Sequence, residues 1–599
     1  MENTQLVDGM TYLTIHAEVK YIAAKKELRV ALIELNGADV IGLDIETSKL
    51  SCHPLAGLNP KVSKVRLIQL YDGKTCYVVD VDRLGMGWMS SLKDKYMVAH
   101  NAQFEDGHLF HAGIKLTNLN CTLLMARVFI GEMGLSLREL SRDAFGVAVD
   151  KTLQVSDWGK AELTDDQINY AALDAVLTYK LKARFDEWFA EHPHYRDTYE
   201  FLRQLIRPTT KQMAVGILID VAAHEAVVKS WKEQQAVALT ELKALNLVVL
   251  PEDKKEAAKL KREGARSLGS PKDKCAVLKE WLTAEELLTW PLTKSGNLNT
   301  GRAALSALEH YPELQALGQY SSLAAKLANY GTKYTELTIE GRLYPQYRIA
   351  GMVSGRFSCT NPNIQNQPRT GFKNIYIASE GMVFIGADLA QVELRVAGLL
   401  SDDKIINQCY ANGEDLHAAM AQDMISKMDD GQYQAELLKF DGDEARLMKH
   451  FRQGAKGINF GLLFGSGEKG LQAYCKATYK IDWSLKEAGD YKALFHAKYA
   501  ELTAWQKLIV SHSQTHAEVE SPYSRLTRHF KDSDYFRGEF RADPYTVCMN
   551  HPVQSGAWEI LALAIIYIDK RAPEGVQISH HVYDELVLTC PDTMKEEAA

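Results

Sequence analysis

The sequence predicts a multidomain protein of mixed α/β and α+β class, and three observations support this. Its 599 residues correspond to roughly four domains of about 150 residues each. Short apolar runs alternate with helical patterns up to about residue 195, which is typical of an α/β domain. Helical periodicity then dominates residues 196–335, and strand-like runs return from about residue 336.

Composition and charge exclude several classes of protein. Hydrophobic residues make up 46% and charged residues 24%, which excludes a disordered, collagen-like or disulfide-stapled chain. The 69 basic and 77 acidic residues give a net charge of −8, which argues against a histone-like coating protein. Binding to nucleic acid stays open, because it depends on local basic patches rather than on total charge.

Cysteine usage and hydropathy indicate an intracellular protein that does not enter a membrane. Nine cysteines are scattered singly without a CxxC pair, so we expect a reducing compartment and neither a zinc cluster nor a disulfide framework. The longest apolar run, residues 560–568, is about half of the ~20 residues that a membrane span needs. The first twenty residues contain no arginine and show no signal or transit pattern.

Local patterns place the expected elements in chain order. We expect strands at 40–43, 65–70, 76–81 and 97–99 and a helix at 163–181, then strands at 343–349 and 382–387, a helical stretch from 391 to about 510, and paired strands around 578–589. The helical region between them contains a basic island, residues 254–274, with eight Lys or Arg against three acids. This island is either a solvated helical hairpin or a contact for phosphates.

Two carboxylate motifs stand out in the first segment. Asp44 and Glu46 lie two residues apart on a predicted strand, so both side chains project from the same face. Crowded carboxylates repel each other unless a cation lies between them, and Mg²⁺ prefers such oxygens. Tyr170 and Asp174 share a helix face, so the phenol could position a water beside a metal-bound carboxylate. Taken alone, the first motif is more often an ordinary strand end than a metal site, and the second is more often a surface Asp beside a core-packed Tyr.

In combination these motifs, with His100–Glu105, resemble the proofreading 3′→5′ exonuclease domain over roughly residues 38–190. The resemblance implies an RNase H-like fold and a two-metal site with a catalytic tyrosine. Its implied ligands are Asp44, Glu46, Asp174 and Glu105, and its implied tyrosine is Tyr170. The chain departs from the family where Glu105 replaces the usual Asp and Cys121–Thr122 replaces the usual Asp-Thr pair. We expect an active exonuclease, with an impaired one as the alternative.

A second pair of acidic motifs lies in the last third of the chain. Asp388 follows the apolar run 382–387, so a strand delivers a carboxylate where a helix begins. Asp584 and Glu585 interrupt an apolar stretch, and burying adjacent carboxylates is costly unless cations compensate. Asp388 and Asp584 are therefore candidates for a second two-metal site. The alternative for Asp584 and Glu585 is a polar hairpin turn.

A helix predicted between these motifs has the pattern of a polyphosphate site. Arg452, Lys456, Phe460 and Phe464 recur every four residues and form one stripe. Two cations one turn apart can grip a polyphosphate, and the aromatic rings beyond them offer a surface on which a base can stack. The alternative is an amphipathic helix whose phenylalanines lie in a core.

Together these segments resemble the three polymerase motifs of the family A DNA polymerases. Segments 354–358, 362–366, 414–417 and 550–554 match further elements in family order, and with the exonuclease the resemblance spans some 90% of the chain. It implies a right-hand polymerase that follows the exonuclease domain. The implied division is 1–195 exonuclease, 196–335 thumb, 336–400 first part of the palm, 401–540 fingers and 541–599 second part of the palm.

The resemblance also implies roles for individual residues. Asp388 and Asp584 are implied Mg²⁺ ligands beside Glu585, with two ions per site and Mn²⁺ as a substitute; Lys456 donates a proton to pyrophosphate. Implied contacts of the nucleotide are Arg452, Lys456, Phe460, His417, Gln391, Glu393 and Phe464, and implied contacts of the DNA are Arg356, Gln365, Asn366, Arg525, Asn550, Gln554 and Tyr583. Glu393 would exclude the ribose 2′ hydroxyl. Tyr583 for His, Phe464 for Tyr and Ser524 for Gly are departures that bear on fidelity and rate.

The leading hypothesis is thus a DNA-templated DNA polymerase that uses dNTPs and a primer-template and carries a proofreading exonuclease. Only about 40 residues precede Asp44, too few for the 5′ nuclease domain of bacterial repair polymerases. We therefore expect a phage-type replicative enzyme, in the cytoplasm of a bacterial host, with an unidentified replisome partner. A single-subunit RNA polymerase is a rival that Glu393 and the exonuclease motifs disfavour. A non-catalytic DNA-binding scaffold is disfavoured by the presence of Asp388, Asp584 and Lys456.

Overall fold

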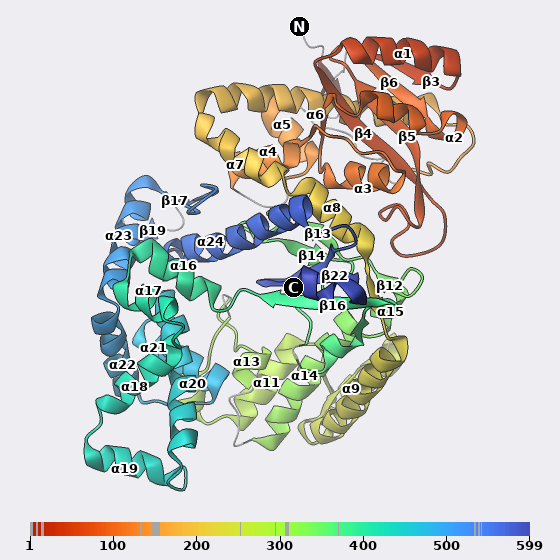
Figure 1. Cartoon of the computed structure of the whole chain (residues 1–599). Helices are drawn as coiled ribbons and strands as arrows, with labels where there is room; N and C mark the ends of the chain where they lie inside the picture. Colours follow the sequence, from red (N-terminus) through yellow and green to blue (C-terminus); the bar gives the residue numbers. More distant parts are fainter. Residues whose placement is uncertain are drawn as a thin grey trace.

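An amino-terminal unit and a larger second part are joined by two helices, α7 (Pro193–Arg203) and α8 (Ile206–Val215) (Figure 1). The computed structural model describes residues 4–7, 10–13, 17–131, 135–146, 156–251, 253–293, 295–305, 311–368, 370–531, 535–536, 539–540 and 542–599. Helix α8 packs against both parts of the molecule, on helix α3 (Gln103–His111) of the first unit and strand β21 (Gln577–Val582) of the second.

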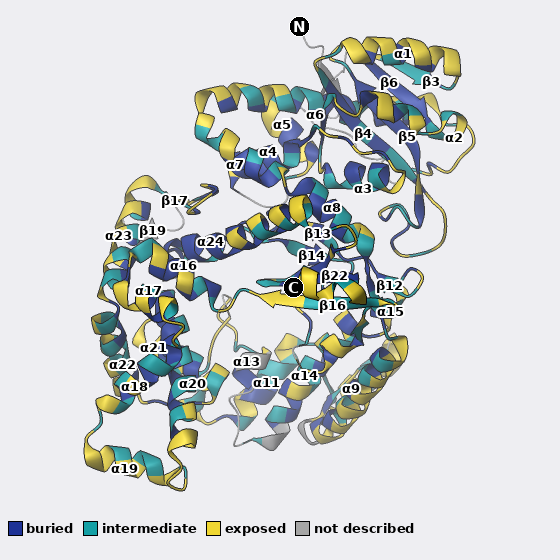
Figure 2. Cartoon of the chain, in the orientation of Figure 1, coloured by how far each residue is buried: buried dark blue, intermediate teal, exposed yellow. Residues whose placement is uncertain are grey.

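A six-stranded sheet organises the amino-terminal unit. Its order is β3 (Glu18–Ile22), β6 (Thr75–Asp80), β5 (Ser63–Tyr71), β4 (Val40–Lys49), β7 (Tyr96–Ala99) and β8 (Leu119–Cys121). Strand β5 runs antiparallel to both neighbours, whereas β4, β7 and β8 are mutually parallel. The four predicted strands are present, and β4 extends the prediction for 40–43 as far as Lys49. Strands β5 and β6 are almost wholly buried, which explains their continuous apolar runs (Figure 2).

Helices cover this sheet. They are α1 (Lys25–Gly37), α2 (Val81–Leu84), α3, α4 (Thr122–Ile130), α5 (Leu137–Phe145) and α6 (Asp165–Glu191). Helix α6 begins where Thr164 and Gln167 form a reciprocal capping box, and it packs across β4, β5 and β6. The predicted helix 163–181 is thus confirmed, and it continues ten residues further because Phe185 and Phe189 remain buried.

Two small sheets lie at the centre of the second part. Strand β22 (Glu585–Pro591) pairs antiparallel with β16 (Met382–Asp388) on one side and with β21 on the other. The other sheet contains β12 (Arg342–Leu343), β9 (Ile217–Ile219) and β15 (Tyr376–Ile377). The expected strand at 343–349 is in fact divided between β12 and β13 (Gln346–Arg348), which pairs with β14 (Ser358–Thr360). Residues 217–219 form β9 of this sheet, although the sequence predicted only helical periodicity over residues 196–335.

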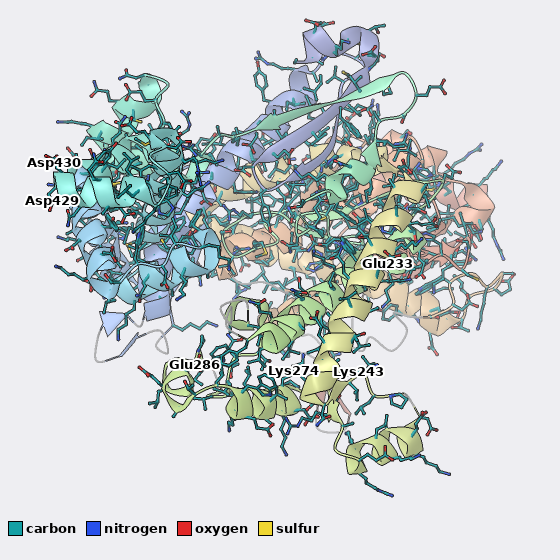
Figure 3. The ribbon with its side chains drawn as sticks, turned by 90° about the horizontal axis from the view of Figure 1, so that it is seen from below. Glu233, Lys243, Lys274, Glu286, Asp429 and Asp430 are labelled. Carbon is teal, nitrogen blue, oxygen red and sulfur yellow. The ribbon has the colours of Figure 1, made fainter. Side chains whose placement is uncertain are left out.

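A helical region lies below these sheets in Figure 1. Its longest helices, α9 (Val221–Glu241) and α14 (Pro312–Tyr330), pack against each other. The chain between them forms the shorter helices α10 (Lys254–Arg262), α11 (Pro271–Trp281), α12 (Ala284–Thr289) and α13 (Arg302–Leu305). Helix α15 (Thr332–Glu336) follows α14. The basic island falls on α10 and the start of α11. No residue of α10 is buried, and Figure 3 shows this helical region from below, with Lys274 of the island labelled.

The helical stretch expected from 391 to about 510 is divided into α16 (Val392–Ser401), α17 (Lys404–Ala411), α18 (Leu416–Ser426), α19 (Asp430–Leu438), α20 (Glu444–Leu463), α21 (Glu468–Tyr479), α22 (Leu485–Lys498) and α23 (Ala500–His516). The divisions are local in origin. Side chains of Asp403, Asp415, Asp429, Asp443 and Ser484 each accept a hydrogen bond from the backbone that follows and so start new helices.

A hairpin of β17 (Glu518–Glu520) and β18 (Thr527–His529) precedes the long helix α24 (Ala542–Arg571), which packs on α16 and reaches toward α8. The chain also contains two-stranded pairs β1 (Thr4–Val7) with β2 (Met10–Leu13) and β19 (Tyr535–Phe536) with β20 (Glu539–Phe540). Within the described residues, every helix is too short or too polar to cross a bilayer.

Candidate active sites

The acidic motifs of the amino-terminal unit line one cavity of about 930 Å³. Strand β4 contributes Asp44 and Glu46, and α6 contributes Tyr170 and Asp174. Helix α3 adds Glu105 from the opposite wall. The structure therefore brings together the five residues that the exonuclease resemblance implies, although 130 positions separate the first from the last.

Glu105 lies in an environment that disfavours its own charge. Its side chain is only 2% exposed, and its Oε2 atom has no hydrogen-bond partner among the described residues. Burial, together with the negative charges of Asp106 and Asp174, raises the pKa of Glu105 well above its usual value. Asp106 instead faces Arg207 of α8 at 2.7 Å. A bound cation would reduce the repulsion among these carboxylates, and divalent ions such as Mg²⁺ prefer oxygen donors. Among the described residues, no group of three or more acidic, His or Cys side chains is already spaced as a metal site, so other ligands would complete it.

Cys121, the departure noted in the sequence, does not line the cavity. Its buried Sγ accepts a hydrogen bond from the backbone of Ala102 at 3.4 Å, and its own N–H donates to Tyr199 at 3.0 Å. The cysteine therefore supports the start of α3 from behind. Its neighbour Thr122 bonds through Oγ1 to the ring of His100 at 3.0 Å, and His100 lines the cavity.

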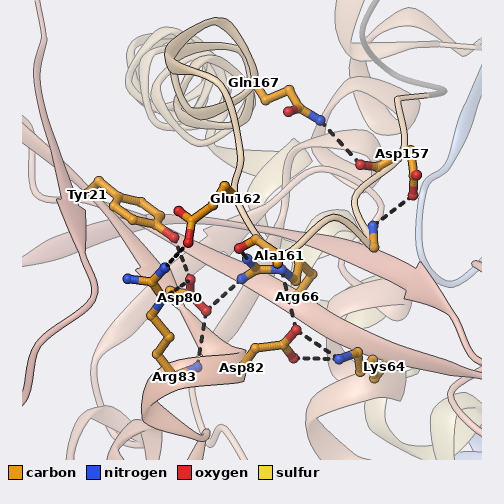
Figure 4. A network of polar contacts seen from close by, with 11 residues as sticks. Tyr21, Lys64, Arg66, Asp80, Asp82, Arg83, Asp157, Ala161, Glu162 and Gln167 are labelled. Carbon is orange, nitrogen blue, oxygen red and sulfur yellow. Dashed lines mark hydrogen bonds and ion pairs between the residues drawn. The ribbon is translucent and has the colours of Figure 1, made fainter.

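A buried ion-pair network, which the sequence did not reveal, holds one wall of this cavity (Figure 4). Arg66 and Asp80 are at most 1% exposed and lie 2.6 Å apart, and Tyr21 also donates to Asp80. The Arg66 guanidinium then donates to the carbonyl of Ala161 at 3.3 Å. Ala161 belongs to the segment that leads into α6. Gln167, in the first turn of α6, donates to the carbonyl of Asp157 at the other end of that segment, at 3.4 Å. Since Asp157 lines the cavity, the network ties the cavity wall to the sheet.

The second acidic centre forms at one edge of the β16–β22–β21 sheet. The register pairs Asp388 directly with Glu585, and Asp584 lies in the turn between β21 and β22. The N–H of Leu389 donates to the carbonyl of Asp584 at 3.1 Å, which fixes the two chain segments side by side. Burial and the charges of Asp584 and Glu585 raise the pKa of Asp388. The structure thus brings these aspartates together, as the sequence predicted.

Lys373 is a partner of this centre that sequence reasoning missed. It lies in a short 3₁₀ helix, η4 (Phe372–Ile375), and forms an ion pair with Glu585. Its positive charge acts against the rise in the Asp388 pKa. The 212 positions between Lys373 and Glu585 leave no local pattern by which the pairing could have been found.

Helix α20 carries Arg452 and Lys456, and its Phe460 lines a cavity together with Asp584, whereas the two cations are absent from that lining. Arg452 donates through Nε to Asp415 at 2.7 Å, while Lys456 forms no ion pair within the described part of the chain.

Three glycines, Gly454, Gly457 and Gly461, let the neighbouring elements approach α20 closely. A Cβ at Gly454 would lie 2.9 Å from Trp483, and one at Gly457 would lie 2.4 Å from Cys475 Sγ. These glycines therefore permit packing that alanine would prevent.

His417 lies next to this helix with its ring almost completely buried. Its Nδ1 contacts the Asn459 amide at 3.0 Å, and its ring centroid is 5.6 Å from that of Phe460. Burial lowers the pKa of His417 to about 4, so the ring is neutral near pH 7. Asn459 was not predicted, and it fixes the orientation of His417.

A cavity of about 480 Å³ joins predicted contacts of the nucleotide and of the DNA. Its lining includes Arg356, Gln365, Glu393, Phe460, Tyr583 and Asp584. Arg356 and Glu393 form an ion pair across it. Tyr583, in the left-handed backbone region at φ 57°, donates its hydroxyl to Asn366.

The remaining predicted contacts lie outside this cavity. Gln391 accepts from the Tyr410 hydroxyl at 2.8 Å, and Phe464 packs into the apolar core around α20. Asn550 and Gln554 are half-buried on α24. Arg525 is exposed in the hairpin before α24 and bonds to Glu520 at 3.0 Å, beside the amino-terminal unit rather than beside the cavity.

Comparison with known proteins yields two family matches. Residues 239–599 match the model of DNA polymerase family A, and residues 19–188 match that of a 3′-5′ exonuclease. DNA polymerase I of Aquifex aeolicus is 25% identical over 585 residues, covering 97% of this chain and 94% of the relative. The thermostable DNA polymerase I of Thermus aquaticus is 26% identical over 66% of this chain but only 44% of its own length.

A solved structure also has this fold. The POL domain of Pol1 from M. smegmatis, in complex with DNA primer-template and dNTP, superposes with a TM-score of 0.75. It covers 96% of this chain and 94% of its own, at 19% sequence identity. The architecture expected from the sequence, an α/β exonuclease unit followed by a polymerase unit, is confirmed by these matches.

Proposed function

The chain belongs to the family A DNA polymerases and carries a 3′-5′ exonuclease domain, and from this premise we propose how its residues divide the two reactions. The predicted reaction class, DNA-templated DNA synthesis, follows from the family. Enzymes with these two domains use divalent metal ions. Our proposal is that the ion is Mg²⁺, that the exonuclease proofreads, and that the enzyme serves phage replication as the sequence predicts.

One observation carries the synthetic half of the proposal: Asp388 and Asp584 meet at one sheet edge, and Asp584 lines a cavity together with Phe460 of the cationic helix α20. These two carboxylates would hold two Mg²⁺ ions, whose chemistry there would be to lower the pKa of the primer 3′ hydroxyl and to offset the charge of the phosphates. In the described residues no three acidic, His or Cys side chains form a complete metal site by themselves. Waters and substrate oxygens would therefore supply the remaining ligands, as is usual for Mg²⁺.

The side chains of α20 act on the nucleotide. Arg452 and Lys456, one turn apart, bind the triphosphate, and Lys456 passes a proton to the departing pyrophosphate oxygen. Neutral His417 donates a hydrogen bond to a phosphate oxygen. Phe460 lines the cavity beside Glu393 and offers its ring to the sugar and base.

The opposite side of the cavity binds the DNA. Arg356 and Gln365 contact the primer-template near the growing end, where minor-groove acceptors are shared by all base pairs. Tyr583 and Asn366, joined by a hydrogen bond, border the primer terminus. Such contacts test the shape of a base pair without reading its sequence.

In the exonuclease cavity, Asp44, Glu46, Asp174 and Glu105 would hold a pair of metal ions, whose chemistry there would be to lower the pKa of a water. Tyr170, which lines the same cavity, would orient the attacking water toward the terminal phosphodiester. The cavity takes a frayed 3′ end, so a mismatched primer terminus is its substrate.

Primer extension with matched and mismatched 3′ ends tests this function. With Mg²⁺ and four dNTPs, a matched primer should be extended to the end of the template. A mismatched primer should first be shortened and then extended. Clear preference for NTPs would favour an RNA polymerase, and extension of the mismatched primer without shortening would contradict proofreading.

Replacing Glu393 by Ala should relax sugar discrimination. The carboxylate, held in place by Arg356, closes the space beside the 2′ position, so its removal admits a ribose hydroxyl. We expect the ratio of kcat/KM for dNTP to kcat/KM for NTP to fall by roughly 10²-fold. This is about the discrimination that a binding site achieves by excluding one small group, here the 2′ hydroxyl. Single-nucleotide incorporation assays measure the ratio. Glu414→Ala, an exposed acid before α18, is the matched control, and an unchanged ratio in Glu393→Ala would refute this role.

A further inference from the structure

One arginine of the exonuclease unit binds the backbone of the polymerase unit. Arg127 of α4 is only 4% exposed. Its Nε donates to the carbonyl of Ala350 at 3.3 Å, and its NH2 group donates to the carbonyls of Met352 and Val353 at 3.1 and 2.8 Å. More than 220 positions separate the donor from its three acceptors. Arg127 is absent from the lining of the exonuclease cavity.

The segment that Arg127 binds leads directly to Arg356. The N–H of Met352 donates to the carbonyl of Arg356 at 3.0 Å, and the N–H of Gly355 donates to the carbonyl of Met352 at 2.9 Å. These bonds close residues 352–356 into one turn. On its other side, Ser555 of α24 donates to the carbonyl of Ser354 at 2.9 Å. The position of the Arg356 side chain therefore depends on how this turn is held, as well as on its ion pair with Glu393.

The backbone that leads into the turn is strained. Ala350 lies in the left-handed region at φ 47°, which is unfavourable for a residue with a Cβ, and such residues persist only where their surroundings hold them. Arg127 donates to that residue's own carbonyl. It thereby stabilises the strained backbone from which the turn begins.

Arg127 is suited to this task because its charge is not used elsewhere. Within the described residues it forms no ion pair, and burial together with the charge of Arg528 lowers its pKa to about 10. The three carbonyl dipoles therefore compensate part of this buried charge, while the NH1 group has no hydrogen-bond partner among the described residues. Only a planar guanidinium can donate to several acceptors in fixed directions, whereas an ammonium on a flexible stem cannot reproduce that geometry.

We infer that Arg127, although part of the exonuclease unit, is a positioning residue of the polymerase site, holding the 352–356 turn so that Arg356 faces the primer terminus. This rests on the proposed contact of Arg356 with the primer-template. Synthesis would then depend on a residue of the exonuclease unit, whereas excision would not depend on the turn in the polymerase unit.

The test uses the full-length enzyme and the variants Arg127→Met and Arg127→Lys. We expect KM for primer-template to rise roughly tenfold in Arg127→Met, the size expected when a positioned group is misplaced, and about threefold in Arg127→Lys. KM for dNTP and excision from single-stranded DNA should stay within about twofold. Thermal unfolding shows whether each variant folds. If Arg127→Met does not fold, Arg127→Lys is compared with the parent enzyme instead.

Gln103→Met is the matched control. Gln103 also joins the two units, donating to the carbonyl of Tyr347 at 3.1 Å and accepting from the N–H of Ile349 at 3.2 Å, but it does not bind the turn. If loosened contact between the units were the whole effect, Gln103→Met would raise KM as much as Arg127→Met does. That result, or an equal loss of excision in Arg127→Met, would overturn the inference.

A double-mutant cycle with Arg356→Ala separates the inference from its premise. If Arg127 acts through Arg356, adding Arg127→Met to Arg356→Ala should change KM for primer-template by less than about twofold. Multiplicative effects would show that Arg127 acts elsewhere. An unchanged KM in Arg356→Ala alone would refute the proposed contact of Arg356. A raised KM in Arg356→Ala with no effect of Arg127→Met would refute the inference alone.

Discussion

Asp388→Ala should abolish primer extension, with kcat falling by several orders of magnitude, roughly 10³-fold or more. The carboxylate ends β16 directly opposite Glu585 and beside Asp584, so its loss removes half of the pair that would hold the metal ions. Excision of a single-stranded 3′ end should persist in the same preparation, because that cavity is formed by other residues. Rapid-quench primer extension with saturating dNTP measures the loss.

Asp592→Ala is the matched control for this variant. Asp592 follows the same sheet, is exposed, and bonds to Lys595 at 3.2 Å. The substitution removes one carboxylate, as Asp388→Ala does, but far from the sheet edge where Asp388 lies. We therefore expect primer extension within about twofold of that of the parent enzyme. Full extension by Asp388→Ala would contradict a catalytic role and favour the scaffold alternative.

The double variant Asp44→Ala/Glu46→Ala should lose digestion of a mismatched 3′ end, again by roughly 10³-fold or more. Both carboxylates project from β4 into the cavity that Glu105 and Asp174 also line. Without them, the remaining acids cannot hold two ions beside the terminal phosphodiester. Time courses on a labelled mismatched primer, without dNTPs, measure excision, and extension of a matched primer should be retained.

Asp165→Ala/Asp166→Ala provides the control for that double variant. It removes the same number of charges from exposed positions in the first turn of α6, the helix that carries Asp174. Excision should remain within about twofold of the parent enzyme. Persistent digestion by Asp44→Ala/Glu46→Ala would defeat the assignment of the cavity, whereas loss in the control alone would indicate a requirement of α6 itself.

Features that depend on neighbouring residues could be predicted from the sequence. The stripe Arg452, Lys456 and Phe460 is a property of helical period, and the structure contains it as one side of α20. The placement of Asp388 at a strand end followed from the apolar run before it. Matching motifs in family order then related these local features to a known arrangement, which is why the two acidic centres could be anticipated.

Features that depend on chain segments meeting across the fold could not be predicted. Lys373 and Glu585, or Arg66 and the carbonyl of Ala161, carry no pattern that relates one to the other. Residues 217–219 show the same limit, because a three-residue strand leaves almost no periodic signal inside a helical stretch.

The sequence by itself thus determined which residues are candidates for the chemistry and on which kind of element each lies, because period and motif are written in adjacent positions. Only the tertiary structure decided what holds those residues in place: Asn459 against His417, Lys373 against Glu585, and Arg127 against the turn before Arg356. The physical reason is that hydrogen bonds and ion pairs act over a few ångströms of space. The path of the chain, and no spacing along it, brings such partners within reach.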